Sequence, residues 1–481
     1  MHSEFVREQR RYTQKELCKV FSCSEDKTVS IIRKLKEFGV LKAVKAEEKQ
    51  WDMSELVDED IEVSDVEIGE NEYLYVFTYV GIIVVSGIVL KCYPKYLLTS
   101  THPERELTQV IKVLEKYNSK EQIIRMFNDS SESRSFNLLA VLLFLMQDYY
   151  ENGIYENADD IVESNGSGEI IWDKTINETF AMISNNRPYY VDLQTRKRIS
   201  DDHNYFKRLH ECVLTVASKE LEDAGLLNLF ELMGIDLSEE TLDDFGDKEV
   251  ILYNIEKELG TQFNTRKQLV LKTIYTYLDH SGSLYDVDCL SLFGTNSFNL
   301  VWEKVCAEIM DNQLDIRLGA LRLPIPLRDK YNKQEKLIDI IEKPLWTVTG
   351  KTAADTLIPD IVSISVFNGD WHFIIFDAKY YNVKLEPGNA PKGQPGIESV
   401  TKQYLYQLAY QEFIGEHKFS VVTNCFLMPT EENDTVDKKS VSLQMLSKLG
   451  LESIKVRFLP ATIAYESYLS GRKIDLSILK L

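Results

Sequence analysis

The chain has 481 residues, 44% of them hydrophobic, and a formal net charge of −21 at pH 7. This length predicts about three domains, and the apolar fraction is sufficient for packed cores. The acidic balance argues against binding of nucleic acid through bulk positive charge, but it leaves room for local basic surfaces.

The cysteines and the apolar runs favour a cytoplasmic protein with reduced thiols. The seven cysteines are scattered and include no Cys-x-x-Cys pair, and the seven histidines form no metal-spaced cluster. We therefore expect neither disulfides nor a structural zinc site. The N-terminus carries no signal-peptide pattern. The most apolar run, residues 80–90, is too short to span a bilayer and predicts buried strands with bends at Gly81 and Gly87.

Residues 1–48 predict a small winged helix-turn-helix-like domain. The segment TQKELCKVF starts with an N-cap signal at Thr13, and a second helical segment ends at Gly39 before the strand-like VLKAVKA. The second helix carries basic side chains that suit phosphate contacts, and the candidate DNA-binding residues there are Lys27, Arg33 and Lys34. A trihelical protein-interaction module is the alternative interpretation.

Residues 49–72 predict an acidic linker. Between Trp51 and Tyr73 the chain has ten Asp or Glu residues and no Lys or Arg. A solvated linker is the favoured interpretation, and a docking strip for a basic partner is the alternative.

The middle region, residues 73–285, predicts a mixed domain in which strands precede helices. Residues 73–94 are rich in Tyr, Val, Ile and Phe, and from residue 102 the apolar period is mostly helical. Residues 168–198 combine a short helix with strand-like segments. We expect this region to contact a partner or DNA, and its clearest positive patch consists of Arg187, Arg196, Lys197 and Arg198.

Residues 286–481 predict an α/β domain built on a mixed sheet. The expected elements are a helix at 298–310, a hairpin at 359–380, a helix at 397–414, two further strands and a closing helix. The whole chain is therefore expected to combine α/β and α+β domains.

The hairpin PDIVSISVFNGDWHFIIFDAK carries the chemistry of this domain. Asn368-Gly369 between two strand-like runs predicts a two-residue turn. That turn fixes a register in which Asp360 lies opposite Asp377, with their Cβ atoms about 4.5–5.5 Å apart on one face. Lys379 lies on the same side as Asp377, because side chains alternate along a strand.

Two like charges that face each other in a sheet are unfavourable, and a divalent cation between them removes the conflict. Oxygen ligands suit Mg²⁺, which proteins hold through one or two carboxylates plus waters and a phosphate oxygen; Mn²⁺ is the expected substitute. Lys379 would position or deprotonate an attacking water, or stabilise the charge that develops on a phosphate. The alternative is a salt bridge between Lys379 and one of the two acids, Asp360 or Asp377, on a solvated edge.

Two neighbouring helices offer further candidates for the site. Glu303 lies among apolar residues of the preceding helix, with Glu308 as its competitor. In the following helix, Gln403 and Gln407 are four residues apart and share a face. Amide side chains there can hold a water or contact a nucleic-acid backbone. Solvated surface residues are the alternative for all of them.

At these residues the chain resembles the PD-(D/E)xK nuclease superfamily, with Asp360, Asp377 and Lys379 matching the motif and Glu303 fitting the first-helix acid. KQYLYQLAY resembles the glutamine-bearing helix of RecB-like and McrC-like members, although Tyr404 stands where some relatives carry an acid. Upstream, YVFTYVGIIVV…LKCYPKYL and GEIIWDKTI…RPYY resemble the LlaJI family of restriction endonuclease subunits, which are McrC-like. The resemblance covers most of residues 73–470.

The resemblance implies a Mg²⁺-dependent endonuclease that cuts double-stranded DNA as the cleavage subunit of a bacterial restriction system, and so a role in phage defence. It also implies a McrB-like AAA+ GTPase or ATPase partner. The sequence contains no G-x-x-x-x-G-K-[ST] motif, so we expect this chain to bind no nucleotide. A homodimer through the nuclease domains is a further expectation.

Two other functions fit the same residues. A stand-alone repair or recombination nuclease would use the same site and cut DNA without nucleotide or partner. A helix-turn-helix regulator would carry an inactive nuclease fold, against which the intact acids and lysine argue. The recognition sequence, the methylation dependence and the role of each glutamine are left open by the sequence.

Overall fold

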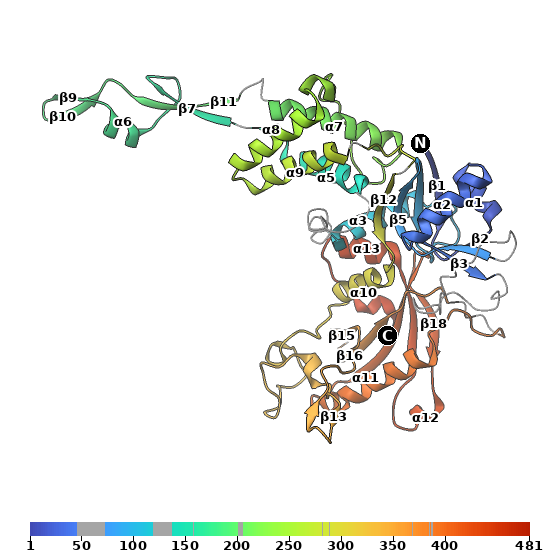
Figure 1. The fold of residues 1–481 in the computed structure, drawn as a ribbon. Helices are drawn as coiled ribbons and strands as arrows, with labels where there is room; N and C mark the ends of the chain where they lie inside the picture. The colour runs from blue at the N-terminus through green and yellow to red at the C-terminus, as the bar shows by residue number, and fades with distance from the viewer. Residues whose placement is uncertain are drawn as a thin grey trace. The chain divides into compact units, whose positions relative to one another are not determined.

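The computed structural model describes residues 1–45, 73–118, 137–156, 158–200, 205–280, 282–287, 289–367, 369–383, 385 and 388–481. They form two compact units, of which the first comprises Met1–Ser133 with Leu292–Leu481 and the second Arg134–Ser291 (Figure 1). The first unit thus joins the N-terminal region to the C-terminal domain, which the sequence had suggested as separate domains. The chain returns to it at Leu292. The predicted linker at 49–72 lies outside the described residues.

The N-terminal region contains the predicted pair of helices. Helix α1 (Gln14–Phe21) begins at Thr13, whose hydroxyl and backbone form a capping box with Glu16. Helix α2 (Glu25–Glu37) follows, and Gly39 with φ 68° ends its last turn. The same region contains a three-stranded antiparallel sheet of order β2-β4-β3. Its strands are β2 (Arg11–Tyr12), β4 (Tyr73–Phe77) and β3 (Leu41–Lys45). The assignment as a winged helix stays a prediction.

A second sheet lies in the same unit and has the order β1-β6-β5-β12. Its strands are β1 (His2–Arg7), β6 (Ile88–Tyr93), β5 (Val80–Val85) and β12 (Leu290–Thr295). The expected buried strands at 80–90 are β5 and β6, which are buried throughout. Gly81 must be glycine, because a Cβ there would lie 2.1 Å from the Phe293 carbonyl oxygen. Close approach of two backbones therefore joins β5 to β12.

The C-terminal part of the first unit has the predicted mixed sheet, of order β15-β16-β17-β19-β18. Strands β16, β17 and β19 are parallel, and the two edge strands are antiparallel to their neighbours. The strands are β15 (Ile361–Phe367), β16 (Asp370–Ala378), β17 (Val421–Thr430), β18 (Val436–Val441) and β19 (Ile454–Pro460).

Helix α11 (Ile397–Glu416) covers one face of this sheet. Its Tyr406, Tyr410 and Phe413 pack on residues of β15 and β16, and its Tyr404 packs on residues of β17 and β19. The side chain of Trp302 in α10 (Phe298–Ile309) donates its indole N–H to the Leu427 carbonyl of β17. The remaining elements of the unit are α3 (Glu104–Asn118), α12 (Gln444–Ser447), α13 (Ala461–Leu469), β13 (Leu345–Trp346), β14 (Lys351–Thr352) and the short 3₁₀ turns η4 (Leu318–Ala320), η5 (Leu337–Ile340) and η6 (Leu476–Leu479).

The second unit contains helices and a strand-rich arm. The helical elements are α5 (Leu138–Asn152), α7 (Tyr205–Asp223), η3 (Leu242–Phe245), α8 (Lys248–Thr261) and α9 (Thr265–His280). The buried carboxylate of Asp148 is paired with Arg266, with 2.6 Å between Oδ2 and Nη2. The arm comprises β7 (Ala158–Ser164), β8 (Glu169–Ile170), α6 (Trp172–Glu178), β9 (Ala181–Ser184), β10 (Arg187–Tyr190) and β11 (Gln194–Ser200).

All seven cysteines lie in the described part of the chain, and no disulfide links them. In the same part, no helix is both long and apolar enough to cross a membrane.

Candidate active site

The hairpin of β15 and β16 has the register predicted from its turn. Phe367 pairs with Asp370 at one end and Ile361 with Phe376 at the other. Gly369 has the expected positive φ, 88°, whereas Asn368 lies outside the described residues. One step beyond Ile361 and Phe376, the chain places Asp360 across from Asp377.

The two carboxyl groups and the lysine meet at this end of the hairpin. Asp360 and Asp377 share a side-chain hydrogen bond. Asp360 Oδ2 also accepts the backbone N–H of Ala378 at 3.0 Å. Lys379 Nζ lies 3.0 Å from Asp377 Oδ1. Asp377 is only 4% exposed, whereas Asp360 and Lys379 are half-buried, so the group lies at the border of the protein interior.

The electrostatics of this group are in conflict. Burial raises the pKa of Asp377 well above its usual value, and the neighbouring Asp360 raises it further; Lys379 offsets only part of this. Burial disfavours the charged form of Lys379, yet the charge and hydrogen bond of Asp377 raise its pKa overall. Burial and the neighbouring Asp360 therefore disfavour the charged form of Asp377, which a bound cation would favour.

Glu303 of α10 belongs to the same electrostatic group. Its pKa is raised to about 7, first by burial and then by the negative charge of Asp360, while Lys379 acts in the opposite direction. Its competitor Glu308 pairs instead with Lys304, at 3.3 Å on the same helix, and with Lys116 at 3.8 Å. These contacts favour Glu303 over Glu308 as the helix acid of the site.

The two glutamines of α11 lie behind the carboxylates. Gln403 is fully buried and donates its amide N–H to the Ile375 carbonyl of β16 at 2.9 Å. Its Oε1 atom is buried and has no protein partner. Gln407 accepts a 2.5 Å hydrogen bond from the side chain of Asn424, a residue of β17 that pairs with Ile375. Both glutamines therefore contact the sheet at the level of Ile375, two residues before Asp377.

Sequence reasoning missed Tyr406. Its pKa is raised to about 12, first by burial and then by the charges of Asp377 and Asp360, so its phenol lies near both acids. A signal was present, because Tyr406 is three residues beyond Gln403 and shares its helix face. Its neighbour Tyr404, where some relatives carry an acid, is buried in the apolar cluster with Phe426 and Val456.

Sequence reasoning also missed a buried cluster beside the site, which has no local signal because its members are distant in the chain. Glu8 Oε2 accepts hydrogen bonds from the Tyr380 hydroxyl at 2.5 Å and from the Lys95 backbone N–H at 3.1 Å. Lys95 Nζ donates to Gln9 at 3.1 Å and lies 4.6 Å from the centre of the Tyr380 ring. The Tyr380 ring contacts Phe298, the first residue of α10, with 5.2 Å between ring centres. Tyr380, which follows Lys379 in the chain, thus connects the end of β1 to the start of α10.

The described residues include no group of three or more His, Cys, Asp or Glu side chains arranged to hold a metal ion. The donors that do meet are Asp360 and Asp377, and one or two carboxylates with waters are a usual Mg²⁺ site. The like-charge contact and the raised pKa of Asp377 fit a cation there. The two residues therefore suit Mg²⁺, with Glu303 close enough to feel their charge.

The predicted DNA-binding residues fall in two separate regions. Lys27 and Arg33 are exposed on α2, and Lys34 is half-buried on the same helix. In the arm, Arg187 lies on β10, whereas Arg196, Lys197 and Arg198 lie on β11 of a different sheet. In the strand register of that sheet Arg196 pairs with Glu169, and Arg198 pairs with Asp160.

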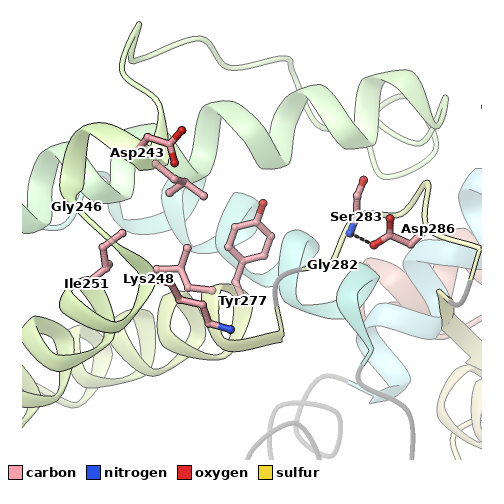
Figure 2. Close-up of a pocket in the computed structure, with 10 residues that line it drawn as sticks. Asp243, Gly246, Lys248, Ile251, Tyr277, Gly282, Ser283 and Asp286 are labelled. Atoms are coloured by element: carbon pink, nitrogen blue, oxygen red, sulfur yellow. Dashed lines mark hydrogen bonds between the residues drawn. The ribbon is translucent and has the colours of Figure 1, made fainter.

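A cleft of about 430 Å³ lies among the helices of the second unit (Figure 2). Tyr277 of α9 and Lys248 of α8 contribute to its lining, and at one end the Ser283 backbone N–H donates to Asp286 at 2.7 Å. None of the predicted site residues lines this cleft.

Comparison with known proteins places the chain among the restriction endonucleases. The model of the LlaJI restriction endonuclease family matches residues 79–326 and 327–461, which is most of the chain. The chain therefore belongs to the LlaJI restriction endonuclease family, and the resemblance predicted from its sequence is confirmed.

A curated relative agrees with this family. The type II restriction enzyme BsuMI component YdjA of Bacillus subtilis (strain 168) is 26% identical over 408 residues, which cover 82% of this chain and 81% of that protein. A structure of the tetradecameric assembly of Thermococcus gammatolerans McrB AAA+ hexamers with bound McrC matches 98% of this chain and 99% of its own, with 12% identity and a TM-score of 0.41. The McrBC complex of the same organism matches 63% and 85%, with 11% identity and a TM-score of 0.26.

Proposed function

We propose that this chain is the DNA-cleaving subunit of a multi-component restriction enzyme and hydrolyses phosphodiester bonds of double-stranded DNA with Mg²⁺. The observation that supports this most directly is the contact of half-buried Asp360 with buried Asp377, with Lys379 Nζ 3.0 Å from Asp377. Two neighbouring carboxylates repel each other without a cation, whereas with one they can serve as its ligands.

Asp360 and Asp377 would hold the Mg²⁺ ion, with Glu303 as the third acid. A bound Mg²⁺ supplies a Lewis acid that polarises the phosphate and lowers the pKa of a bound water. Lys379 would orient the attacking water, and its ammonium would stabilise the negative charge that develops on the phosphate. Gln403 would hold β16 in place through the Ile375 carbonyl and leave Oε1 available for a water.

A nucleotide-hydrolysing partner is the second part of the proposal. The curated relative is named a component of its restriction enzyme, and the present sequence lacks a P-loop motif. We therefore assign recognition or translocation to a McrB-like AAA+ subunit. The arm of the second unit offers it a surface, since its apolar side chains are largely exposed, with Phe180 at 96%: Trp172, Ile176, Phe180, Met182, Ile183, Tyr189 and Val191. Exposed apolar patches of this kind mark protein contacts.

The test is plasmid cleavage in Mg²⁺ with the full chain, with and without a McrB-like NTPase subunit and its nucleotide. Lys379→Ala and Asp377→Ala are compared with wild type. We expect nicked or linear plasmid from wild type only, and only when partner and nucleotide are present. If both variants cleaved the plasmid as well as wild type does, the site assignment would be wrong. Full cleavage by wild type without the NTPase subunit and its nucleotide would instead favour a stand-alone nuclease and contradict the proposed partner.

Cleavage of both strands needs two sites or two successive events, so we also propose a homodimer through the nuclease domains. Light scattering of the full chain on a DNA duplex measures this. A complex that contains one copy and still linearises plasmid in a single event would contradict the homodimer without affecting the site.

A further inference from the structure

The segment between α10 and β15 is basic in an otherwise acidic chain. Residues 316–351 contain eight Lys or Arg and four Asp or Glu, although the whole chain has a net charge of −21. Two of the eight are neutralised, because Lys330 pairs with Glu412 and Glu416, and Lys336 pairs with Asp315. The other six are exposed and have no ion pair with a described residue: Arg317, Arg322, Arg328, Lys333, Lys343 and Lys351.

This segment ends in a hairpin whose tip is apolar. Strands β13 and β14 pair Leu345 with Thr352 and Trp346 with Lys351. The turn is tight, since the backbone N–H groups of Thr349 and Gly350 both donate to the Trp346 carbonyl, at 3.1 and 2.9 Å. Trp346 is nevertheless 66% exposed and Val348 99% exposed. The backbone thus holds two large apolar side chains in solvent next to a lysine.

The basic segment is fixed to the side of the sheet that carries the carboxylates. Leu318, Leu337 and Ile341 pack in one cluster with Tyr406 of α11 and with Ile375 of β16. Ile375 and Asp377 lie on the same face of β16, since they are two residues apart. The part of the segment before the hairpin thus packs on the face of the sheet that α11 covers.

A direct link joins the residues just before the segment to the site. The side chain of Asn312 donates to the Asp360 carbonyl at 3.2 Å and accepts the Val362 N–H at 3.1 Å. The chain then leaves the hairpin at Thr352 and reaches Asp360 within eight residues. Anything bound by the basic segment is therefore held by the same substructure as the two acids.

We propose that residues 316–351 form the DNA-docking surface of the nuclease domain, and that the β13–β14 hairpin inserts Trp346 and Val348 into a groove of the duplex while Lys343 and Lys351 contact the flanking phosphates. This inference rests on the proposed function, since it assumes that DNA is the substrate. Unpaired cations match the phosphate backbone, and apolar wedges flanked by cations are a known way to enter the minor groove between base steps. A second copy of the chain is a poorer match, because a symmetric contact would bring the same cations together.

The phosphate contacts are tested by the salt dependence of binding. The full chain is titrated into a fluorescein-labelled duplex in Ca²⁺, which replaces Mg²⁺ to prevent cleavage, at several salt concentrations. Lys343→Gln/Lys351→Gln should reduce the slope of log K against log salt by about 1.8, or about 0.9 for each lost phosphate contact. The control is Lys448→Gln/Lys480→Gln, two exposed lysines of the same unit, which should bind as wild type does.

The insertion of the hairpin is tested by crosslinking. p-Benzoylphenylalanine replaces Trp346 in one variant and Met445, which is also 66% exposed, in the control. On irradiation with the duplex we expect a protein–DNA crosslink from position 346 and none from 445. A crosslink from 346 to a second copy of the chain, or to no DNA while the variant still binds the duplex, would overturn the insertion.

The outcomes separate this inference from the proposed function. If wild type cuts plasmid with its partner but the lysine variant keeps the wild-type salt slope and position 346 gives no DNA crosslink, the docking surface is wrong and the nuclease assignment stands. If wild type neither binds nor cuts DNA under any of these conditions, both are wrong.

Discussion

Two buried carboxylate clusters lie next to each other in the first unit, and they differ in how their charges are satisfied. In one, Asp360 and Asp377 hydrogen-bond each other and share the single ammonium of Lys379. In the other, Glu8 is alone and receives the Tyr380 hydroxyl and the Lys95 N–H. Lys379 and Tyr380 are consecutive, so one peptide separates the two clusters.

This difference indicates which of the two clusters is suited to cation binding and catalysis. The Glu8 cluster supplies donors to its only carboxylate, and such a network holds elements together. The Asp377 cluster has an excess of acid, which costs stability in the absence of a cation and creates affinity for one. Since the clusters share a strand end, the satisfied one can hold the other in position.

The largest expected effect is on cleavage. Asp377→Asn removes a proposed Mg²⁺ ligand and should reduce the plasmid cleavage rate by more than about 100-fold, as for loss of other groups that stabilise transition-state charge. The same change removes a like-charge contact, so the melting temperature should stay the same or rise. Asp370→Asn, at the exposed turn end of the same strand, is the control and should cut normally. A melting temperature that falls with Asp377→Asn would indicate a structural salt bridge with Lys379 instead.

Mg²⁺ should stabilise the first cluster and not the second. At a Mg²⁺ concentration roughly 100-fold above Kd, one site adds about 2.7 kcal/mol to the free energy of unfolding. Thermal melting with and without Mg²⁺ measures this gain, which Asp360→Asn/Asp377→Asn should abolish and Tyr380→Phe should keep. A gain that persists in the aspartate variant would place the cation elsewhere.

Breaking the Glu8 cluster should lower the free energy of unfolding but leave the DNA cleavage activity of the folded protein largely unchanged. Tyr380→Phe removes one donor to a buried carboxylate, and the expected loss is about 1–3 kcal/mol in the free energy of unfolding. The folded fraction should still cut DNA in Mg²⁺. The control is Tyr331→Phe, a half-buried tyrosine on the same unit whose loss of a hydroxyl should change stability less. Cleavage that disappears while the protein remains fully folded would show that the cluster positions Lys379.

The smallest effect concerns pH in the absence of metal. The pKa of Glu303 is raised to about 7, so the folded state holds this proton more tightly than the unfolded state does. Its contribution to stability is therefore complete below the usual pKa of 4.5 and is lost as the pH rises through about 7. Melting temperatures in EDTA should fall over this range, and Glu303→Gln should flatten part of the fall. Glu308→Gln, on the same helix, should leave the profile unchanged.

Local patterns in the sequence predicted much of this protein. The capping signal at Thr13 predicted the start of α1, and the Asn-Gly turn predicted the register that brings Asp360 to Asp377, because both depend on residues a few positions apart. Alternation along β16 placed Lys379 beside Asp377. The segments upstream of the nuclease motif were sufficient to predict the LlaJI family.

Only the tertiary structure decided how distant segments meet. Nothing near Glu8 indicates that it will accept the Tyr380 hydroxyl, since 372 residues separate them. The burial of Gln403, the charge that Tyr406 feels from both acids, and the pairing that occupies Glu308 likewise depend on which elements pack together. Turns and caps are set by local backbone geometry, whereas the environment of a titratable side chain is set by long-range packing, which single-sequence patterns do not contain.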